Sequence, residues 1–224
     1  MNKIISAEKA ADLVKDGDTV MIGGFMSCGA PHLLIDKIHK KNVKNLTVIS
    51  NDTGFAEDTE HNKAGIGKLI VNKHIAHMIT SHIGTNKETG RQMNSGETKV
   101  SLIPQGTMAE QIRAAGCGLG GILTQTGLKT EVEEGKEKLV IDGKEYLLEK
   151  PLKGDVALLK GAVVDKKGNI FYSKTGRNFN PLMAMACKTV IVEADRIVEV
   201  GEIDPDSVVT SHIFIDYIVD GRIR

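Results

Sequence analysis

The first half of the chain alternates short apolar runs with segments of helical spacing. The apolar runs have the length and the β-favouring composition of strands, and they lie at residues 19–22, 46–50, 75–80 and 100–104. Helical spacing lies between them, at residues 6–14, from Pro31 to about residue 42, and at residues 107–115. Strands that alternate with helices in this way predict an α/β fold, in which an open, mostly parallel sheet carries helices on both faces.

The pattern changes between about residues 124 and 154. A charged, solvated stretch at residues 131–138 precedes two apolar runs that Asp142-Gly143 separates, and this dipeptide strongly favours a hairpin turn. We therefore predict a small β-rich flap here, attached to a single domain that spans residues 1–224. Strand patterns return after the flap, at residues 156–164, 170–173, 189–193 and 213–219.

Composition narrows the classes of function. Lys plus Arg equals Asp plus Glu at 29 each, so no net field would attract nucleic acid or an anionic membrane. The chain reaches Glu8 before any apolar signal segment develops, and no apolar stretch approaches a membrane span. The three cysteines are odd in number and widely spaced, which fits a reducing compartment. We expect a soluble, cytoplasmic protein without nucleic acid or membrane partners.

A glycine-rich run follows the first predicted strand. It reads Gly23-Gly24-Phe25, then three residues, then Gly29-Ala30-Pro31. Glycines at a strand-to-helix turn let the backbone approach a ligand and point N–H groups at negative charge, and the helix N-terminus adds to the effect. The spacing GGFxxxGxP is neither a Walker loop nor GxGxxG. Any α/β protein can carry a glycine-rich turn, so the motif alone leaves that alternative open.

Two neutral amides follow predicted strands directly. Asn51 comes after the strand at 46–50, and Gln105 comes after the strand at 100–104. Ligands of open α/β sheets bind at the carboxyl ends of the strands. An amide there can donate to a carboxylate or thioester oxygen without adding a competing charge. Both residues could instead only cap turns, and position alone does not decide between the two roles.

The glycine-rich run resembles the signature of family I coenzyme A-transferases, and in particular of their α subunits. Family-like sequence continues through the chain, in Ser50-Asn51, Pro104-Gln105-Gly106-Thr107, residues 111–118 and residues 177–180. The resemblance implies the fold of that family and the transfer of CoA between a short-chain acyl-CoA (acetoacetyl-, butyryl- or acetyl-CoA) and a free carboxylic acid. It also implies Asn51 and Gln105 as polar supports of acyl transfer. The residues that it implies for CoA binding are Gly23, Gly24, Phe25, Gly29, Pro31 and Arg177.

The family's nucleophile is missing from this chain. Family I enzymes use a glutamate in a Ser-Glu-Asn-Gly or similar sequence of the β half, and no such sequence occurs here. The glutamates that occur are expected on a surface helix, in the solvated stretch, or after late strands without a glycine-rich context; they include Glu8, Glu131, Glu133, Glu134, Glu137, Glu193, Glu199 and Glu202. The resemblance therefore implies a β subunit that carries the glutamate, in an α2β2 heterotetramer, with coenzyme A as co-substrate and no permanently bound cofactor.

Other clusters favour structural roles. His74, His77 and His82 straddle an alternating strand and have no second ligand group at zinc spacing, so no metal site is expected. Cys28 lacks an activating partner and is expected to be a small buried filler. Residues 116–121 match no phosphate loop and are expected to lead into the flap. Arg177 could contact anionic CoA or a carboxylate, or be an ordinary surface arginine.

Two other classes of function are compatible with this broad architecture. A phosphosugar isomerase would need an acid/base carboxylate beside glycine-rich phosphate loops of a single chain. A small-metabolite sensor would bind a ligand without turnover, although no DNA-binding module accompanies the chain.

Overall fold

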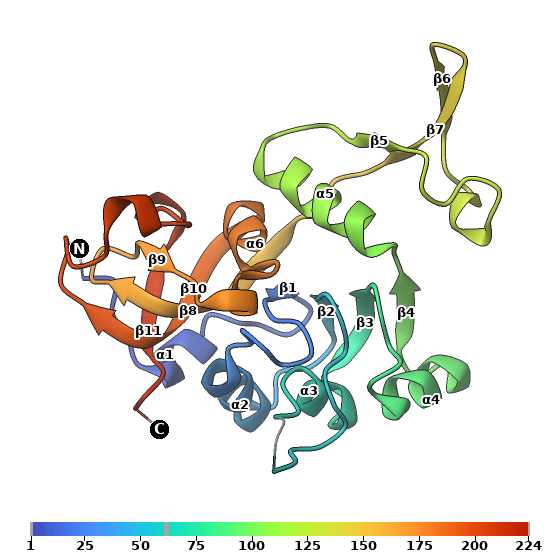
Figure 1. Ribbon diagram of the computed structural model, residues 1–224. Helices are drawn as coiled ribbons and strands as arrows, with labels where there is room; N and C mark the ends of the chain where they lie inside the picture. Colours follow the sequence, from blue (N-terminus) through green and yellow to red (C-terminus); the bar gives the residue numbers. More distant parts are fainter. Residues whose placement is uncertain (1, 61–62, 224) are drawn as a thin grey trace.

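A mostly parallel sheet forms the centre of the molecule. The computed structural model describes residues 2–60 and 63–223. Its main sheet has eight strands in the order β11-β10-β8-β1-β2-β3-β4, all parallel to their neighbours, with β9 antiparallel to β8 (Figure 1). The strands are β1 Thr19–Ile22, β2 Leu46–Ile49, β3 Ile75–Thr80, β4 Lys99–Leu102, β8 Gly154–Asp165, β9 Ile170–Phe171, β10 Cys187–Val198 and β11 Tyr217–Asp220. The predicted α/β fold class is confirmed.

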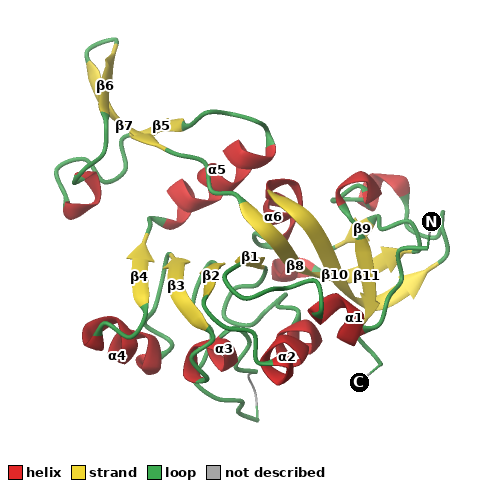
Figure 2. Cartoon of the chain, turned by 180° about the vertical axis from the view of Figure 1, so that it is seen from behind, coloured by secondary structure: helices red, strands yellow, loops and turns green. Residues whose placement is uncertain are grey.

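Helices cover both faces of this sheet (Figure 1 and Figure 2). One face carries α1 Ala7–Ala11, α2 His32–Lys41, α3 Gly67–Val71 and α4 Lys87–Ser95, and the other carries α5 Gln105–Gly116 and α6 Asn180–Ala186. Successive side chains of a strand point to opposite faces of the sheet, so each strand contributes to the hydrophobic cores on both faces. Val20 and Ile22 pack in the core under α1 to α3, while Met21 between them packs in the core under α5 and α6. Within the described residues, every helix is too short or too polar to cross a lipid bilayer.

Several element boundaries differ from the prediction. Ser6 caps α1 as expected, but the helix ends at Ala11 rather than near residue 14. The last strand begins at Tyr217 rather than 213, because a short 3-10 helix precedes it. The 3-10 helices are η1 Glu131–Glu133, η2 Lys174–Arg177, η3 Pro205–Ser207 and η4 His212–Phe214. Three α-helices, α3, α4 and α6, had no counterpart in the sequence prediction.

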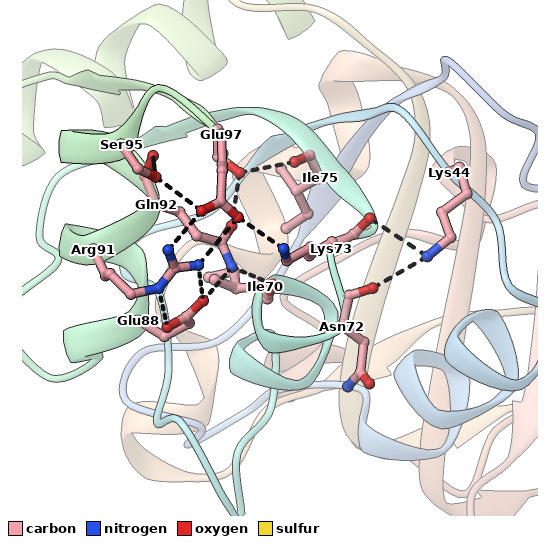
Figure 3. A network of polar contacts seen from close by, with 11 residues as sticks. Lys44, Ile70, Asn72, Lys73, Ile75, Glu88, Arg91, Gln92, Ser95 and Glu97 are labelled. Atoms are coloured by element: carbon pink, nitrogen blue, oxygen red, sulfur yellow. Dashed lines mark hydrogen bonds and ion pairs between the residues drawn. The ribbon is translucent and has the colours of Figure 1, made fainter.

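Helix α4 is held mainly by polar contacts (Figure 3). The buried Gln92 side chain donates to the Ile70 carbonyl of α3 at 2.9 Å and to Glu88 at 2.8 Å. Arg91 pairs with both Glu88 and Glu97, and Lys73 also reaches Glu97. The helix therefore docks on α3 through a buried amide and its surrounding ion pairs, without a stripe of large apolar side chains.

The predicted flap is a three-stranded antiparallel sheet in the order β5-β7-β6. Its strands are β5 Ile122–Thr124, β6 Lys138–Ile141 and β7 Lys144–Glu149, and it projects from the end of α5 (Figure 1). Asp142 and Gly143 both have positive φ, as the predicted two-residue hairpin requires. Glu149 anchors the base of the flap, because its buried carboxylate accepts from Gln111 of α5 at 3.1 Å and pairs with Lys136 at 2.5 Å.

Candidate functional site

The topology gathers polar residues at one edge of the main sheet. The strand order reverses direction between β1 and β8, and such a switch point opens a crevice at the carboxyl ends of the strands. The glycine-rich turn leaves β1 there. The neighbouring strand ends lead into Asn51 after β2, Ser81 after β3 and Gln105, the first residue of α5, after β4. Residues from four separate segments therefore meet along this edge.

Asn51 and Gln105 contact each other, although β3 separates their strands. The Gln105 Nε2 group donates to Asn51 Oδ1 at 2.8 Å. The Ser81 hydroxyl lies 3.0 Å from the same Oδ1 atom and 2.7 Å from the Asn51 carbonyl oxygen. Asn51 is only 3% exposed, and Gln105 is exposed. The structure thus brings together the two amides that the sequence placed at strand ends, with β3 and Ser81 between them.

This arrangement fixes what the Asn51 side chain can do. Its carbonyl oxygen is occupied by Gln105 and Ser81, so the amide NH2 group must point the other way. That NH2 group has no acceptor among the described residues. Beside Gln105, a cleft of about 530 Å³ opens between α5 and β5, a volume typical of small-molecule sites. Gly106, the residue after Gln105, lies in the lining of this cleft. The pair itself offers neutral N–H donors at the carboxyl ends of the strands, which suits a carbonyl or carboxylate oxygen.

Asp52 is a site residue that the sequence reasoning missed. Its side chain is 2% exposed, and each carboxylate oxygen accepts one backbone N–H group: Met26 at 2.6 Å and Gly54 at 2.6 Å. The bond from Met26 joins the glycine-rich turn to the loop that carries Asn51. A polar side chain directly after Asn51 is the only local signal, and it does not reveal a partner 26 residues away.

The N–H groups of the glycine-rich turn are largely occupied within the protein. Gly23 donates to the Leu158 carbonyl at 3.0 Å, and Gly24 donates to Asn178 Oδ1 at 3.0 Å. Phe25 and Cys28 exchange backbone hydrogen bonds, which closes the turn on itself. Both N–H groups therefore have acceptors within the protein, and a contact of Gly23 and Gly24 with CoA stays a prediction. Close packing explains the glycines.

Two asparagines brace this turn from the segment before α6. Asn178 Nδ2 donates to the Cys28 carbonyl at 3.1 Å, while its Oδ1 accepts from Gly24. Asn180 is fully buried; its Nδ2 donates to the Gly29 carbonyl at 3.1 Å and its Oδ1 accepts from the Lys160 N–H at 3.1 Å. Asn178 has φ 22° and ψ −123°, a strained conformation for a residue with a Cβ atom. The family-like segment 177–180 thus shapes the turn.

A carboxylate of the protein occupies the N-terminus of α2. Glu193 lies inside β10, is 2% exposed, and accepts from the Leu34 N–H at 3.0 Å. The prediction that Glu193 follows a strand is wrong. The helix N-terminus, which was expected to add to the attraction of the turn for negative charge, faces this carboxylate of the protein. Lys160 pairs with Glu193 at 2.9 Å and with Asp195 at 2.7 Å. Burial would lower the pKa of Lys160, but the two carboxylates raise it.

The remaining predicted site residues surround the turn. Phe25 is exposed at its tip, Gly29 packs against Gly176, and Pro31 is the N-cap directly before α2. Arg177 ends η2 on the surface, and its side chain makes no hydrogen bond or ion pair with a described residue. The role of Arg177 in CoA binding stays a prediction.

Cys28 corrects another expectation. It is exposed rather than buried, and its Sγ atom lies 3.3 Å from the Thr175 hydroxyl. The turn closes between Phe25 and Cys28 through their backbones, so the thiol is left on the outer side.

The histidines of the β3 region have separate partners. His74 Nδ1 lies 2.6 Å from the Val43 carbonyl, and its Nε2 lies 2.9 Å from His39 Nδ1. His77 contacts the Ser101 hydroxyl at 2.8 Å, and His82 is exposed. Among residues 2–60 and 63–223, no group of three or more His, Cys, Asp or Glu side chains could hold a metal ion.

We expect the free energy of unfolding to fall as the pH drops from 7.5 to 5.5. Burial lowers the pKa of His74, and it also lowers those of His32 and His77. The folded state therefore favours neutral imidazoles, while the unfolded chain takes up protons below its ordinary pKa of about 6.5. Protonation would also remove the His74 acceptor for His39. Urea unfolding at the two pH values measures this loss.

A His74→Gln variant serves as the control for this pH dependence. Removal of the titrating ring should make the unfolding free energy less sensitive to pH over the same window. Carboxylates ordinarily titrate below this window, so they contribute little to the difference. Stability that rises on acidification would contradict the expectation.

Comparisons with known proteins match nearly the whole chain. The family model described as "Coenzyme A transferase" matches residues 4–221. The α subunit of the acetoacetyl-CoA:acetate/butyrate CoA transferase of Clostridium acetobutylicum is 51% identical over 218 residues, 97% of either chain. The α subunit of the Escherichia coli acetate CoA-transferase is 49% identical over 217 residues, 97% of this chain and 96% of that one.

Solved structures share the fold at low sequence identity. An acyl-CoA transferase of Escherichia coli superposes with a TM-score of 0.87 at 19% identity, over all of this chain and 50% of that one. The glutaconate coenzyme A-transferase of Acidaminococcus fermentans gives a TM-score of 0.80 at 18% identity, over 97% of this chain and 75% of that one. The chain thus spans half the length of the first of these solved proteins.

Proposed function

The chain belongs to the coenzyme A transferase family, and from that premise we propose that it is the α subunit of a hetero-oligomeric enzyme. The enzyme would move CoA between a short-chain acyl-CoA and a free carboxylic acid. Acetoacetyl-CoA with acetate or butyrate are the proposed substrates, because an α subunit named for them is 51% identical over 97% of this chain. The observation that carries the proposal is the Asn51–Gln105 amide pair at the strand ends.

In the proposed reaction, CoA passes from the first acyl group to a glutamate of a partner chain, and from that glutamate to the second acid. The glutamate carboxylate attacks the thioester carbonyl, the carbon–sulfur bond breaks, and the products are a CoA thiolate and a mixed anhydride of the acyl group with the glutamate. The thiolate then attacks the glutamyl carbonyl of that anhydride, which releases the first acid and leaves a glutamyl-CoA thioester. The same steps in reverse, with the second acid, give the new acyl-CoA. No redox change or further reactant is needed, and the thioester energy is retained.

Asn51 and Gln105 would stabilise the charge that develops in these steps. Each attack at a carbonyl puts negative charge on its oxygen, and preorganised N–H donors lower the energy of that state most where water is excluded. The orientation of Asn51, set by Gln105 and Ser81, leaves its NH2 group available as such a donor. Because both groups are neutral, they do not compete with the charge of the attacking carboxylate.

The buried glutamates of this chain support a nucleophile on a partner. Glu193 is committed to Lys160 and the N-terminus of α2, and Glu149 is committed to Lys136 and to Gln111 of α5. We propose that a β subunit supplies the glutamate, in an α2β2 assembly. The named relatives are themselves α subunits. We further propose that CoA is a co-substrate, that no cofactor is permanently bound, and that the enzyme acts in the cytoplasm.

The isomerase and sensor alternatives gain no support. A phosphate loop needs free backbone N–H groups, whereas those of Gly23 and Gly24 are engaged within the protein. The high-identity relatives carry transferase names.

A CoA-transfer assay tests the proposed function. Acetoacetyl-CoA and acetate are supplied to this chain alone, to a β chain that carries the glutamate motif, and to the mixture. Activity is expected only in the mixture. Activity of this chain alone would overturn the divided site. A mixture that forms a complex on gel filtration but transfers no CoA would overturn the proposed substrates.

A further inference from the structure

One buried side chain, that of Asp52, connects the glycine-rich turn to the loop that carries Asn51. We propose that Asp52 is a positioning residue for acyl transfer: its buried carboxylate ties the glycine-rich turn to the loop of Asn51 and thereby fixes the amide pair. This inference rests on the proposed function. It assigns the glycine-rich turn an indirect role in acyl transfer, through the amide pair.

The carboxylate of Asp52 joins two backbone segments with one oxygen each. Oδ2 accepts from the Met26 N–H at 2.6 Å, and Oδ1 accepts from the Gly54 N–H at 2.6 Å. Hydrogen bonds to an ionised acceptor are shorter and stronger than those to a neutral one. The side chain is almost fully buried, so water competes little for either oxygen. The tie is therefore rigid at both ends.

The backbone at Met26, which donates to Asp52 Oδ2, is strained. Met26 and Ser27 have φ of 46° and 66°, a left-handed conformation that residues with a Cβ atom seldom adopt. Asn178 braces the opposite side of the same turn through Gly24 and Cys28. Asp52 and Asn178 thus both hold the turn, and of the two it is Asp52 that is also bonded in sequence to Asn51.

The other end of the tie leads directly to Asn51. Asp52 is the next residue, and the Ser50 hydroxyl donates to its carbonyl at 2.9 Å. The Asn51 carbonyl is held in turn by the Ser81 N–H at 3.1 Å. A shift of Asp52 would therefore displace the Asn51 backbone and, with it, the amide that meets Gln105.

A double-mutant cycle tests this role in the reconstituted α–β enzyme. Asp52→Asn keeps the shape of the side chain, but its NH2 group cannot accept a hydrogen bond, so the N–H group of either Met26 or Gly54 loses its acceptor. We expect this variant to lower kcat/KM about tenfold in the wild-type background, as modest misplacement of a positioned group does. In a Gln105→Ala background the same change should lower kcat/KM less than about twofold, because the pair that Asp52 positions is already broken. A loss by the same factor in both backgrounds would indicate general damage and overturn the proposal.

Asp155→Asn is the matched control. Asp155 also accepts a backbone N–H group, from Thr19 at 3.0 Å, but at the opposite end of β1. It should change kcat/KM less than about twofold in either background. An equal effect of the two Asp→Asn changes would also overturn the proposal.

A second measurement separates this inference from the proposed function. Amide hydrogen exchange of the peptide that contains Met26 should be faster in Asp52→Asn than in wild type, in the isolated chain and without any substrate. If Asp52→Asn gives too little folded protein, Asp52→Ser, which keeps one acceptor oxygen, takes its place. Unchanged exchange would refute the tie itself. Faster exchange with an inactive wild-type enzyme would instead refute the proposed function and leave the tie standing.

Discussion

Replacement of Gln105 by alanine should lower the turnover of the reconstituted enzyme about a hundredfold to a thousandfold, equal to about 3–4 kcal/mol of transition-state stabilisation. Two effects add in this variant. The Gln105 amide itself is removed, and Asn51 Oδ1 loses the donor that fixes its orientation. Steady-state CoA transfer from acetoacetyl-CoA to acetate measures the loss.

Stability and assembly should persist in the Gln105→Ala variant. Gln105 is exposed and begins α5, where alanine is a good helix former, so the unfolding free energy should change by less than about 1 kcal/mol. Gln125→Ala, at an exposed position of the flap, is the matched control and should leave turnover unchanged. Near-normal turnover of Gln105→Ala would remove this residue from the site.

The overall architecture was predictable because the sheet is buried on both faces and its strands alternate with helices. Helix α4 was not predicted from the hydrophobic pattern. Its buried side chains are Thr89 and Gln92, and it docks through the hydrogen bonds of Figure 3 rather than through an apolar stripe. A search for large apolar residues at helical spacing therefore passes over it. Strand β10 extends to Val198 because β8 pairs with it along that length, a tertiary effect invisible in the sequence between Asp195 and Val198.

The site was predictable where its residues follow strands directly. Asn51 and Gln105 stand at strand ends, so the parallel topology alone brings them to one edge. The hydrogen-bond acceptors of the N–H groups in the glycine-rich turn were not predictable. Gly24 donates to Asn178 and Met26 donates to Asp52, and both acceptors are far away in the sequence. Spacing shows that a turn has glycines. It does not show whether a ligand or another segment fills the space that they leave.

Gly23→Ala should destabilise the protein by roughly 3–5 kcal/mol, a large part of the stability of an ordinary domain. A Cβ atom at residue 23 would lie 1.9 Å from Asn180 Oδ1 and 2.6 Å from its Cγ. The Asn180 side chain cannot swing away freely, because it bonds the backbone of Lys160 and Gly29. Either the clash persists or these buried hydrogen bonds break. Urea unfolding of the isolated chain measures the loss.

Gly90→Ala provides the control for this substitution. Gly90 lies within α4, and a Cβ atom there would meet nothing within 4 Å, so alanine should be neutral or stabilise the protein by up to about 1 kcal/mol. Equal stability of the Gly23→Ala and Gly90→Ala variants would contradict the clash.

The double variant Gly23→Ala/Asn180→Ser tests the cause of the destabilisation. Serine is shorter than asparagine, so its side chain vacates the space that the Cβ atom of residue 23 would enter. Asn180→Ser alone should lose the bonds to Lys160 and Gly29. The double variant should therefore be more stable than the sum of the two single losses predicts, by at least about 1 kcal/mol. Strict additivity would mean that alanine at residue 23 destabilises the turn through its own backbone, and that Asn180 is not the reason for the glycine.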